Sequence, residues 1–280
     1  KRIGIGSSSS VYSIRGTDLV AKISALTTSD RYVPERGPFS RPLRVRYEDR
    51  TIYTTKQYDI STSLLSVLPL CIEAEALDFI QQGGPYFISS VEDHYFVEAG
   101  NDLYKVLVQE GYSGKAMSYR ENTHLETALF IHQMCLVFND FDSRGVIHRD
   151  VKPENILQLG SSPTKLGDSK LIDFGSVTFT PDVALPYPLQ ALHQLQKQEY
   201  VRRRMLMGTP AFLSPEQARG EELTPRTDLF SFGLTLVEIL TGVIVNDALS
   251  VREAMSNVAE NPRLLKEKSN RIMEVKEVDS

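Results

Sequence analysis

The chain has 280 residues, and its 31 Lys plus Arg against 36 Asp plus Glu give a formal net charge of 31 − 36 = −5. Apolar residues make up 41% and charged residues 24%, as in ordinary globular proteins. This composition argues against a disordered chain, a collagen or a disulfide scaffold, and the lack of a basic excess argues against a sequence-independent nucleic-acid binder. We expect no nucleic-acid partner. We also expect no membrane span, because no uncharged apolar run approaches about 18 residues.

The chain has two cysteines, Cys71 and Cys135. Two free, buried thiols are the expectation. A disulfide between them stays open, because two cysteines do not fix the redox compartment.

The first 112 residues are rich in strand patterns, interrupted by one helical pattern. Residues 1–23 predict strands, and alternation returns over 86–112. Between them, residues 70–82 predict a helix that places Glu73, Leu77 and Ile80 on one face, at i, i+4 and i+7.

A separate stretch lies between these patterns. Alternation on both sides of Glu48-Asp49 predicts a β-hairpin with Leu43, Val45 and Tyr47 opposite Ile52. A disordered loop is the competing interpretation.

The remainder of the chain is helix-rich. Residues 125–143 predict a helix, and residues 228–242 predict one that is apolar on nearly all sides and therefore buried. Residues 251–258 and 262–275 can supply two further helices. On the helix at 125–143, we expect one apolar row made of Ala128, Ile131, Cys135 and Phe138.

A glycine-rich stretch opens the chain, with Gly4, Gly6, Ser9 and Val11 in the pattern G-x-G-x-x-S-x-V. Glycines allow a turn to lie close to phosphates, with backbone N–H groups facing the anion. An ordinary hairpin turn is the more common meaning of such a stretch. Lys22 lies within an apolar strand, where it could face solvent or hold phosphate oxygens beside a helix carboxylate. Glu73 is the first candidate for that carboxylate, because it shares the inward face of its helix, and Glu75, which points elsewhere, is the second.

The strongest chemical signal is the loop between two apolar pieces at 146–157, which holds Asp150, Lys152 and Asn155. A carboxylate, an ammonium and an amide within six residues can accept a proton, neutralise phosphate and ligate a metal. Asp173 then follows an apolar strand, and Asp173 with Asn155 suits Mg²⁺, which takes few carboxylates. Taken singly, such residues are more often turn formers.

The motifs occur in a fixed order: the glycine stretch, Val20-Ala21-Lys22-Ile23, His148-Arg149-Asp150 with Asn155, Asp173-Phe174-Gly175, and Ser214-Pro215-Glu216. From Ile3 to about Gly242 the sequence resembles the eukaryotic-type protein kinase family, for which these motifs are the established signature. The resemblance implies an α+β, two-lobed fold over residues 1–280. A small antiparallel β-sheet lobe would span residues 1–112, with an insertion at about 31–59, and a large, mainly helical lobe residues 113–280. Only 280 − 242 = 38 residues follow Gly242, so either the large lobe is shortened or the chain is a trimmed core.

The resemblance also implies roles for single residues. Asp150 would be the catalytic base, Lys152 would neutralise the transferring phosphoryl group, and Thr209 would bond both. Asn155 and Asp173 would hold Mg²⁺, with Mn²⁺ as an alternative ion. The residues implied in ATP binding are Gly4, Gly6, Ser9, Val11, Ala21, Lys22, Glu73, Gln109, Glu110, Tyr112 and Leu157. Of these, Val11, Ala21 and Leu157 would enclose the purine, Gln109 would lie behind it, and Glu110 to Tyr112 would offer backbone groups.

Lys152 and the segment 208–216 resemble the serine/threonine branch, which implies a protein substrate. Two gaps exceed those usual in the family. The gap from Lys22 to Glu73 defines the insertion, a candidate docking site for a regulatory partner, and in the gap before Glu216 we predict a helix over 187–205. Arg149 before Asp150 implies control by phosphorylation of the activation segment, and control by the insertion is the alternative. The candidate phosphorylation sites are Thr178, Thr180, Tyr187 and Tyr200.

Three other functions stay open. A pseudokinase would keep this fold as a nucleotide-sensing scaffold, although such proteins usually lose the equivalents of Lys22, Asp150 or Asp173, and all three are present. A binding module could act through the insertion. Phosphotransfer to a small molecule is disfavoured by the segment 208–216, which resembles a peptide-docking platform.

Overall fold

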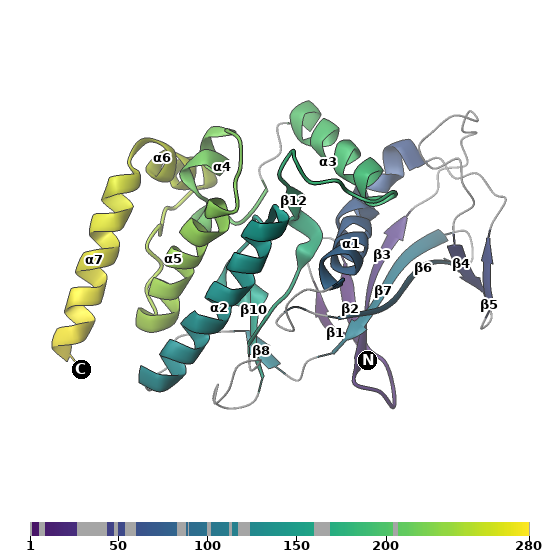
Figure 1. Ribbon diagram of the computed structural model, residues 1–280, viewed down its shortest axis with the longest axis horizontal. Coiled ribbons are helices and arrows are strands. Elements are labelled where there is room, and N and C mark those ends of the chain that lie inside the picture. The colour runs from purple at the N-terminus through teal and green to yellow at the C-terminus, as the bar shows by residue number, and fades with distance from the viewer. Residues whose placement is uncertain are drawn as a thin grey trace. The chain divides into compact units, whose positions relative to one another are not determined.

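The computed structural model divides into two compact units, each described here by itself (Figure 1). The first unit comprises Lys1–Gln82, Ser89–Tyr112 and Leu185–Gln198, and the second comprises Gly83–Ile88, Ser113–Ala184 and Glu199–Ser280. The residues that the structure describes are 2–5, 9–26, 44–47, 50–53, 60–82, 88, 90–99, 102–111, 114–116, 124–159, 169–203 and 207–279.

A seven-stranded sheet forms the base of the first unit, in the order β1-β2-β3-β7-β6-β4-β5. All neighbours are antiparallel except β4 and β6. The strands are β1 (Arg2–Ile5), β2 (Ser10–Ser13), β3 (Leu19–Leu26), β4 (Arg44–Tyr47), β5 (Arg50–Tyr53), β6 (Val91–Ala99) and β7 (Asp102–Glu110).

The predicted hairpin is confirmed, since β4 and β5 pair antiparallel with Val45 opposite Ile52. Leu43 lies outside the described residues. The hairpin adds to the edge of the sheet through a parallel pair, which sets Val45 beside Phe96 and Arg46 beside Val97. The otherwise antiparallel sheet therefore gains one parallel pair, because β4 runs in the same direction as β6.

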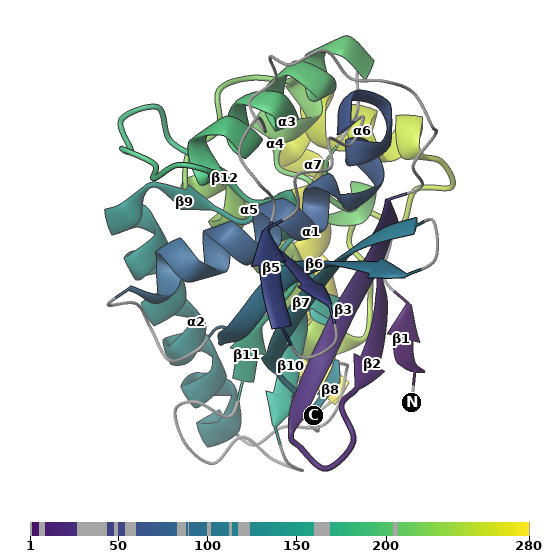
Figure 2. The ribbon, with the colours of Figure 1, turned by 90° about the vertical axis from the view of Figure 1, so that its right-hand side faces the viewer.

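Helix α1 (Ile60–Gln81) packs against β3, β7 and β6 of this sheet (Figure 2). It begins ten residues before the predicted start, and Pro69 lies inside it. The expected inward face is confirmed, since Leu77 and Ile80 are fully buried and Glu73 is 3% exposed.

The second unit is mainly helical. Its short strands are β8 (Gly114–Ala116), β9 (Val146–Ile147), β10 (Ile156–Leu159), β11 (Ser169–Leu171) and β12 (Thr178–Phe179). Its helices are α2 (His124–Arg144), α4 (Pro215–Arg219), α5 (Arg226–Thr241), α6 (Val251–Glu260) and α7 (Pro262–Asp279). Helices α6 and α7 confirm the two helices predicted near the C-terminus.

The buried face of α2 follows the predicted row only in part, because Phe138 is buried and Ile131 is half-buried. Ala128 and Cys135 are exposed, while Phe130, Met134 and Phe141 are buried. Two apolar rows overlap on this helix, and the row with the bulkier side chains buries more surface. The expectation of two buried thiols is wrong for Cys135, and both Cys71 and Cys135 are free.

Helix α5 is not buried on all sides, because Leu229 is 48% exposed. Its core contact is made by Phe232, whose ring lies 5.9 Å from that of Phe130 and 5.2 Å from that of Phe138 on α2. Its polar residues Asp228 and Thr235 are instead buried. The Thr235 hydroxyl donates to the carbonyls of Ser231 at 2.8 Å and Val151 at 3.3 Å, and the Asp228 carboxylate accepts from backbone N–H groups.

Helix α3 (Leu189–Arg203) confirms the helix predicted over 187–205. Leu189 and Leu192 are buried. The stretch Leu185–Gln198, which contains both, belongs to the first unit although it lies between segments of the second.

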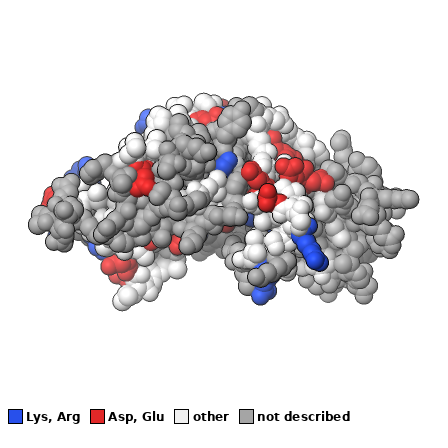
Figure 3. Space-filling view, turned by 90° about the horizontal axis from the view of Figure 1, so that it is seen from below, with Lys and Arg blue, Asp and Glu red and all other residues white. Residues whose placement is uncertain are grey.

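The described helices include none that combines the length and apolar character needed to cross a membrane. On the face drawn in Figure 3, the described residues carry both acidic and basic side chains and form no broad basic patch. This distribution agrees with the net charge of −5.

Replacing Leu192 tests the packing of α3. Leu192 is 3% exposed, so Leu192→Ala should weaken the docking of the helix by about 2 kcal/mol, which corresponds to about 30-fold faster amide exchange over residues 189–198. Hydrogen–deuterium exchange measures this rate. The matched control is the exposed neighbour Gln194→Ala, and equal exchange in both variants would contradict the packing.

Candidate active site

A buried ion pair joins β3 to α1 in the first unit. The Nζ atom of Lys22 lies 2.5 Å from Oε1 of Glu73, and the two side chains are 10% and 4% exposed. The predicted partner is therefore confirmed, while Glu75 lies near His94. Removing one partner of such a pair leaves a buried charge uncompensated. Because Glu73 lies on α1, the pair depends on the position of that helix.

The glycine-rich stretch forms an antiparallel hairpin beside Lys22. Gly4 pairs with Val11, and Val11 in turn pairs with Lys22 of β3. Ser9 is half-buried, and Gly6 lies outside the described residues.

Two other predicted residues, Ala21 and Gln109, lie on the paired strands β3 and β7. Ala21 is buried in a cluster with Val106 and Val108 of β7. Gln109 follows on the same strand and is buried, and its side-chain oxygen has no hydrogen-bond partner among the described residues.

At the end of β7, two backbone N–H groups are already bonded. That of Glu110 donates to the carbonyl of Ser90 at 3.0 Å, and that of Gly111 donates to the carbonyl of Asp18 at 2.7 Å. The N–H groups of Glu110 and Gly111 are therefore committed within the unit. Tyr112 lies outside the described residues.

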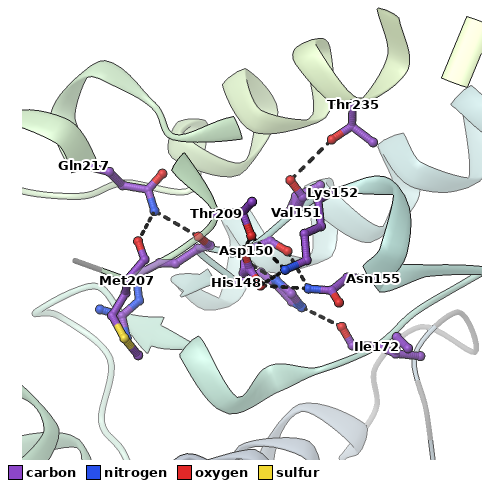
Figure 4. Close-up of polar contacts among 11 residues, drawn as sticks. His148, Asp150, Val151, Lys152, Asn155, Ile172, Met207, Thr209, Gln217 and Thr235 are labelled. Atoms are coloured by element: carbon purple, nitrogen blue, oxygen red, sulfur yellow. Dashed lines mark hydrogen bonds and ion pairs between the residues drawn. The ribbon is translucent and has the colours of Figure 1, made fainter. Parts of the chain in front are cut away.

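In the second unit, Asp150 is the centre of a polar network (Figure 4). The Lys152 ammonium donates to Asp150 Oδ2 at 2.9 Å and to Thr209 Oγ1 at 2.7 Å, and the Thr209 hydroxyl donates to Asp150 Oδ1 at 2.7 Å. The Asn155 amide donates to the carbonyl and to Oδ2 of Asp150, at 2.8 and 3.0 Å. The expected contacts of Thr209 with Asp150 and Lys152 are confirmed.

These contacts set the protonation of Asp150. Burial raises its pKa, but the hydrogen bond and charge of Lys152 and the hydrogen bond of Thr209 outweigh burial, so the pKa is lowered below the usual 3.8. Asp150 is therefore a carboxylate near neutral pH and can accept a proton.

Asp228 at the start of α5 holds the loop that carries Asp150. It is 1% exposed, and its two carboxylate oxygens accept from the backbone N–H groups of His148 at 2.7 Å and Arg149 at 2.9 Å. The Arg149 carbonyl accepts from Gln217 Nε2 at 2.9 Å. Arg149 has φ 68°, in the left-handed region that non-glycine residues seldom adopt, so these bonds secure a strained peptide.

The Arg149 side chain is bonded to main-chain carbonyls. Its Nε donates to the carbonyl of Ser176, and its Nη2 donates to that of Val177 at 3.2 Å. Among the predicted phosphorylation sites, Thr178 is buried and Tyr187 is 52% exposed. In this structure the guanidinium therefore meets the activation segment through backbone atoms.

Asp173 and Asn155 are the predicted metal ligands. The backbone N–H of Ile172 donates to the Asn155 carbonyl at 2.9 Å, which ties the two segments together. Phe174 is fully buried, with its ring 4.8 Å from His148 and 6.0 Å from Phe141. Asn155 bonds Asp150 through its amide NH₂ group, and its amide oxygen takes no part in those bonds. That oxygen and the Asp173 carboxylate are hard oxygen donors, the kind of ligand that suits Mg²⁺.

Leu157 of β10 is half-buried and pairs with Ala116 of β8 and Lys170 of β11. The predicted residues thus form two groups, one on each unit.

Sequence reasoning missed Asp228 and Gln217, whose side chains bond the backbone of the loop that carries Asp150. The signal for Asp228 was a carboxylate at the start of an otherwise apolar helix.

The family profile described as "Protein kinase domain" matches residues 91–279. The chain belongs to the protein kinase family. The matched residues contain the Asp150 network and Asp173, whereas Lys22 and Glu73 precede them.

The kinase is similar to several bacterial proteins. It is 30% identical over 165 residues to the serine/threonine-protein kinase pkn3 of Myxococcus xanthus, covering 59% of this chain and 26% of that protein. It is 34% identical over 134 residues to the serine/threonine-protein kinase PknB of Mycolicibacterium smegmatis, covering 47% and 18%. It is 38% identical over 98 residues to PknL of Mycobacterium tuberculosis, covering 35% and 20%. The chain therefore spans about a quarter or less of these relatives.

Replacing Asp228 tests its hold on the catalytic loop. Asp228→Asn keeps one acceptor oxygen but turns an NH₂ group toward a backbone N–H, so the protein should lose about 1–3 kcal/mol of stability. Urea unfolding measures this loss. The exposed Asp142→Asn on α2 is the control and should change stability by less than about 0.5 kcal/mol. Equal stabilities of the two variants would contradict the role of Asp228.

Proposed function

We propose that this protein is a serine/threonine kinase that transfers the γ-phosphoryl group of ATP to a hydroxyl of a protein substrate. The observation that carries the proposal is the network in which Asp150 is held by Lys152, Thr209 and Asn155. The names of the bacterial relatives and the presence of Lys152 favour the serine/threonine branch.

In the proposed reaction, the Asp150 carboxylate accepts the proton of the substrate hydroxyl as the oxygen attacks the γ-phosphorus. Its lowered pKa keeps it ionised for that step. Lys152 places its ammonium beside Asp150 and balances the charge of the transferring group. The Thr209 hydroxyl fixes the orientation of the Asp150 carboxylate.

We also propose roles in nucleotide binding for single residues. Lys22, held by Glu73, would bind phosphate oxygens, and the hairpin of Gly4 and Val11 would cover them. Gln109 offers a buried acceptor that a bound ligand could satisfy. Asn155 and Asp173 would hold Mg²⁺ or Mn²⁺, which when bound neutralises phosphate charge.

The proposed domain layout is a small lobe of residues 1–112 with an insertion at 31–59 and a large lobe of residues 113–280. The hairpin of the insertion extends the sheet at its edge, and docking of a regulatory partner at the insertion stays a prediction. A pseudokinase is the second candidate. It is less well supported, because Lys22 and Asp150 are both present and hydrogen-bonded.

A phosphoryl-transfer assay tests the proposal. With radiolabelled ATP and a peptide library containing Ser, Thr and Tyr, the protein should label Ser or Thr peptides. Asp150→Ala should lower that rate by about 10²- to 10⁴-fold, because the general base is lost. Asp142→Asn serves as the control. Equal labelling by wild type and Asp150→Ala would refute the catalytic role of Asp150.

The hydroxyl of Thr209 has a measurable effect on Asp150. Because its hydrogen bond lowers the pKa of Asp150, Thr209→Ala should raise that pKa. When the pH is lowered, Asp150 should therefore become protonated at a higher pH in Thr209→Ala than in the wild type. A ¹³C NMR titration of the Asp150 carboxyl carbon measures the shift. Thr224→Ala is the control, and an unchanged titration in Thr209→Ala would show that the hydroxyl does not stabilise the carboxylate.

A further inference from the structure

A row of three side chains crosses the sheet of the first unit beneath α1. Lys22 of β3 and His94 of β6 are both register partners of Leu107 on β7, so the three lie side by side on one face of the sheet. Leu107 is fully buried in the middle of the row. One end of the row is therefore an ammonium and the other an imidazole.

Helix α1 meets both ends of this row. Glu73 bonds Lys22, while on the other flank Asp78 Oδ2 lies 2.8 Å and Glu75 Oε1 3.8 Å from Nε2 of His94. Asp78 follows Glu73 by five residues, which places it about 140° further round the helix. The contact of Glu73 with Lys22 and the contact of Asp78 with His94 thus lie on either side of the buried Leu107.

Lys105 completes the second contact. It is 3% exposed, and its ammonium lies 2.9 Å from Nδ1 of His94. Nδ1 of His94 thus faces the Lys105 amino group, while Nε2 faces the Asp78 carboxylate. Lys105 also lies over the Phe96 ring, 5.0 Å from its centre. The imidazole is therefore held from both sides.

A cation site is the competing explanation of this cluster. Ligand atoms of Glu75, Asp78 and His94 all lie within 4.8 Å of one another. Lys105, however, already places its amino group 2.9 Å from Nδ1 of the same imidazole. Burial lowers the pKa of Lys105, and the nearby groups Cys71, Glu75, Asp78 and Asp93 oppose that shift. The contacts with Lys105 and Asp78 already engage both ring nitrogens of His94 without an added ion.

We infer that His94 and Lys105 are positioning residues, which together with Asp78 fix the rotation of α1 about its axis and so keep Glu73 against Lys22. A roll of about 30° would move a carboxylate at about 5 Å from the helix axis by about 3 Å. That displacement would break the 2.5 Å contact between Glu73 and Lys22. The inference rests on the proposed function for its effect on catalysis, but the contact itself can be measured without catalysis.

The test compares His94→Leu, which removes both hydrogen bonds of the ring, with His94→Gln, which keeps one donor and one acceptor. Acylation of Lys22 by an N-hydroxysuccinimide ester, followed by mass spectrometry, reports the Glu73 contact, and a fluorescent ATP analogue reports nucleotide affinity. We expect His94→Leu to raise the rate of Lys22 acylation and to weaken ATP binding, each about tenfold, and His94→Gln to restore most of both. The exposed His132→Leu on α2 is the matched control.

A double-mutant cycle separates positioning from general destabilisation. In a Glu73→Gln background, His94→Leu should have no further effect on Lys22 acylation, because the contact that it positions is already lost. An effect of the same size in both backgrounds, or a His94→Leu variant that behaves like His132→Leu, would overturn the inference. If circular dichroism shows that His94→Leu does not fold, Lys105→Met, which removes the donor to His94, replaces it in both experiments. Altered Lys22 acylation in a protein without transferase activity would support the positioning role and reject only the proposed function.

Discussion

The buried carboxylate of Asp228 is the contact on which the geometry of the second unit depends. It accepts two backbone N–H groups from His148 and Arg149, eighty and seventy-nine residues earlier in the chain. Burying a carboxylate is costly unless hydrogen bonds compensate it, and here the compensation is also the support for a strained turn. Asp150 follows that turn directly. Asp228 therefore supports the backbone from which the Asp150 side chain projects, while Lys152, Asn155 and Thr209 bond the carboxylate itself.

The first unit uses a comparable arrangement in which charged groups are held by neighbours rather than by solvent. Lys22 and Glu73 form a pair that is almost fully buried. A buried pair contributes little net stability, because desolvation offsets the attraction. The pair instead fixes the position of the Lys22 ammonium. The position of Glu73 depends on α1, which packs through Leu77 and Ile80 and also bonds His94 through Asp78. Packing fixes the distance of the helix from the sheet, whereas the polar contacts fix its rotation.

Local sequence patterns predicted the elements better than the contacts between them. The inward face of Glu73, the hairpin of β4 and β5, and helix α3 each follow from periodicity within a few residues. The row predicted for α2 was correct for Phe138 but wrong for Ala128 and Cys135, because periodicity alone does not distinguish these two from the bulkier residues of the neighbouring row. The roles of Asp228 and of the His94–Lys105 pair could not be predicted, since both arise from tertiary pairing between segments distant in the chain.

The contact between Arg149 and the carbonyls of Ser176 and Val177 has a consequence for variation among related chains. Every residue type has a carbonyl oxygen, so no substitution at positions 176 or 177 removes the acceptor itself. These two contacts thus follow the path of the backbone. A side-chain change at Ser176 can leave both acceptors in place, whereas Val177, Thr178 and Phe179 are buried and stay constrained by packing.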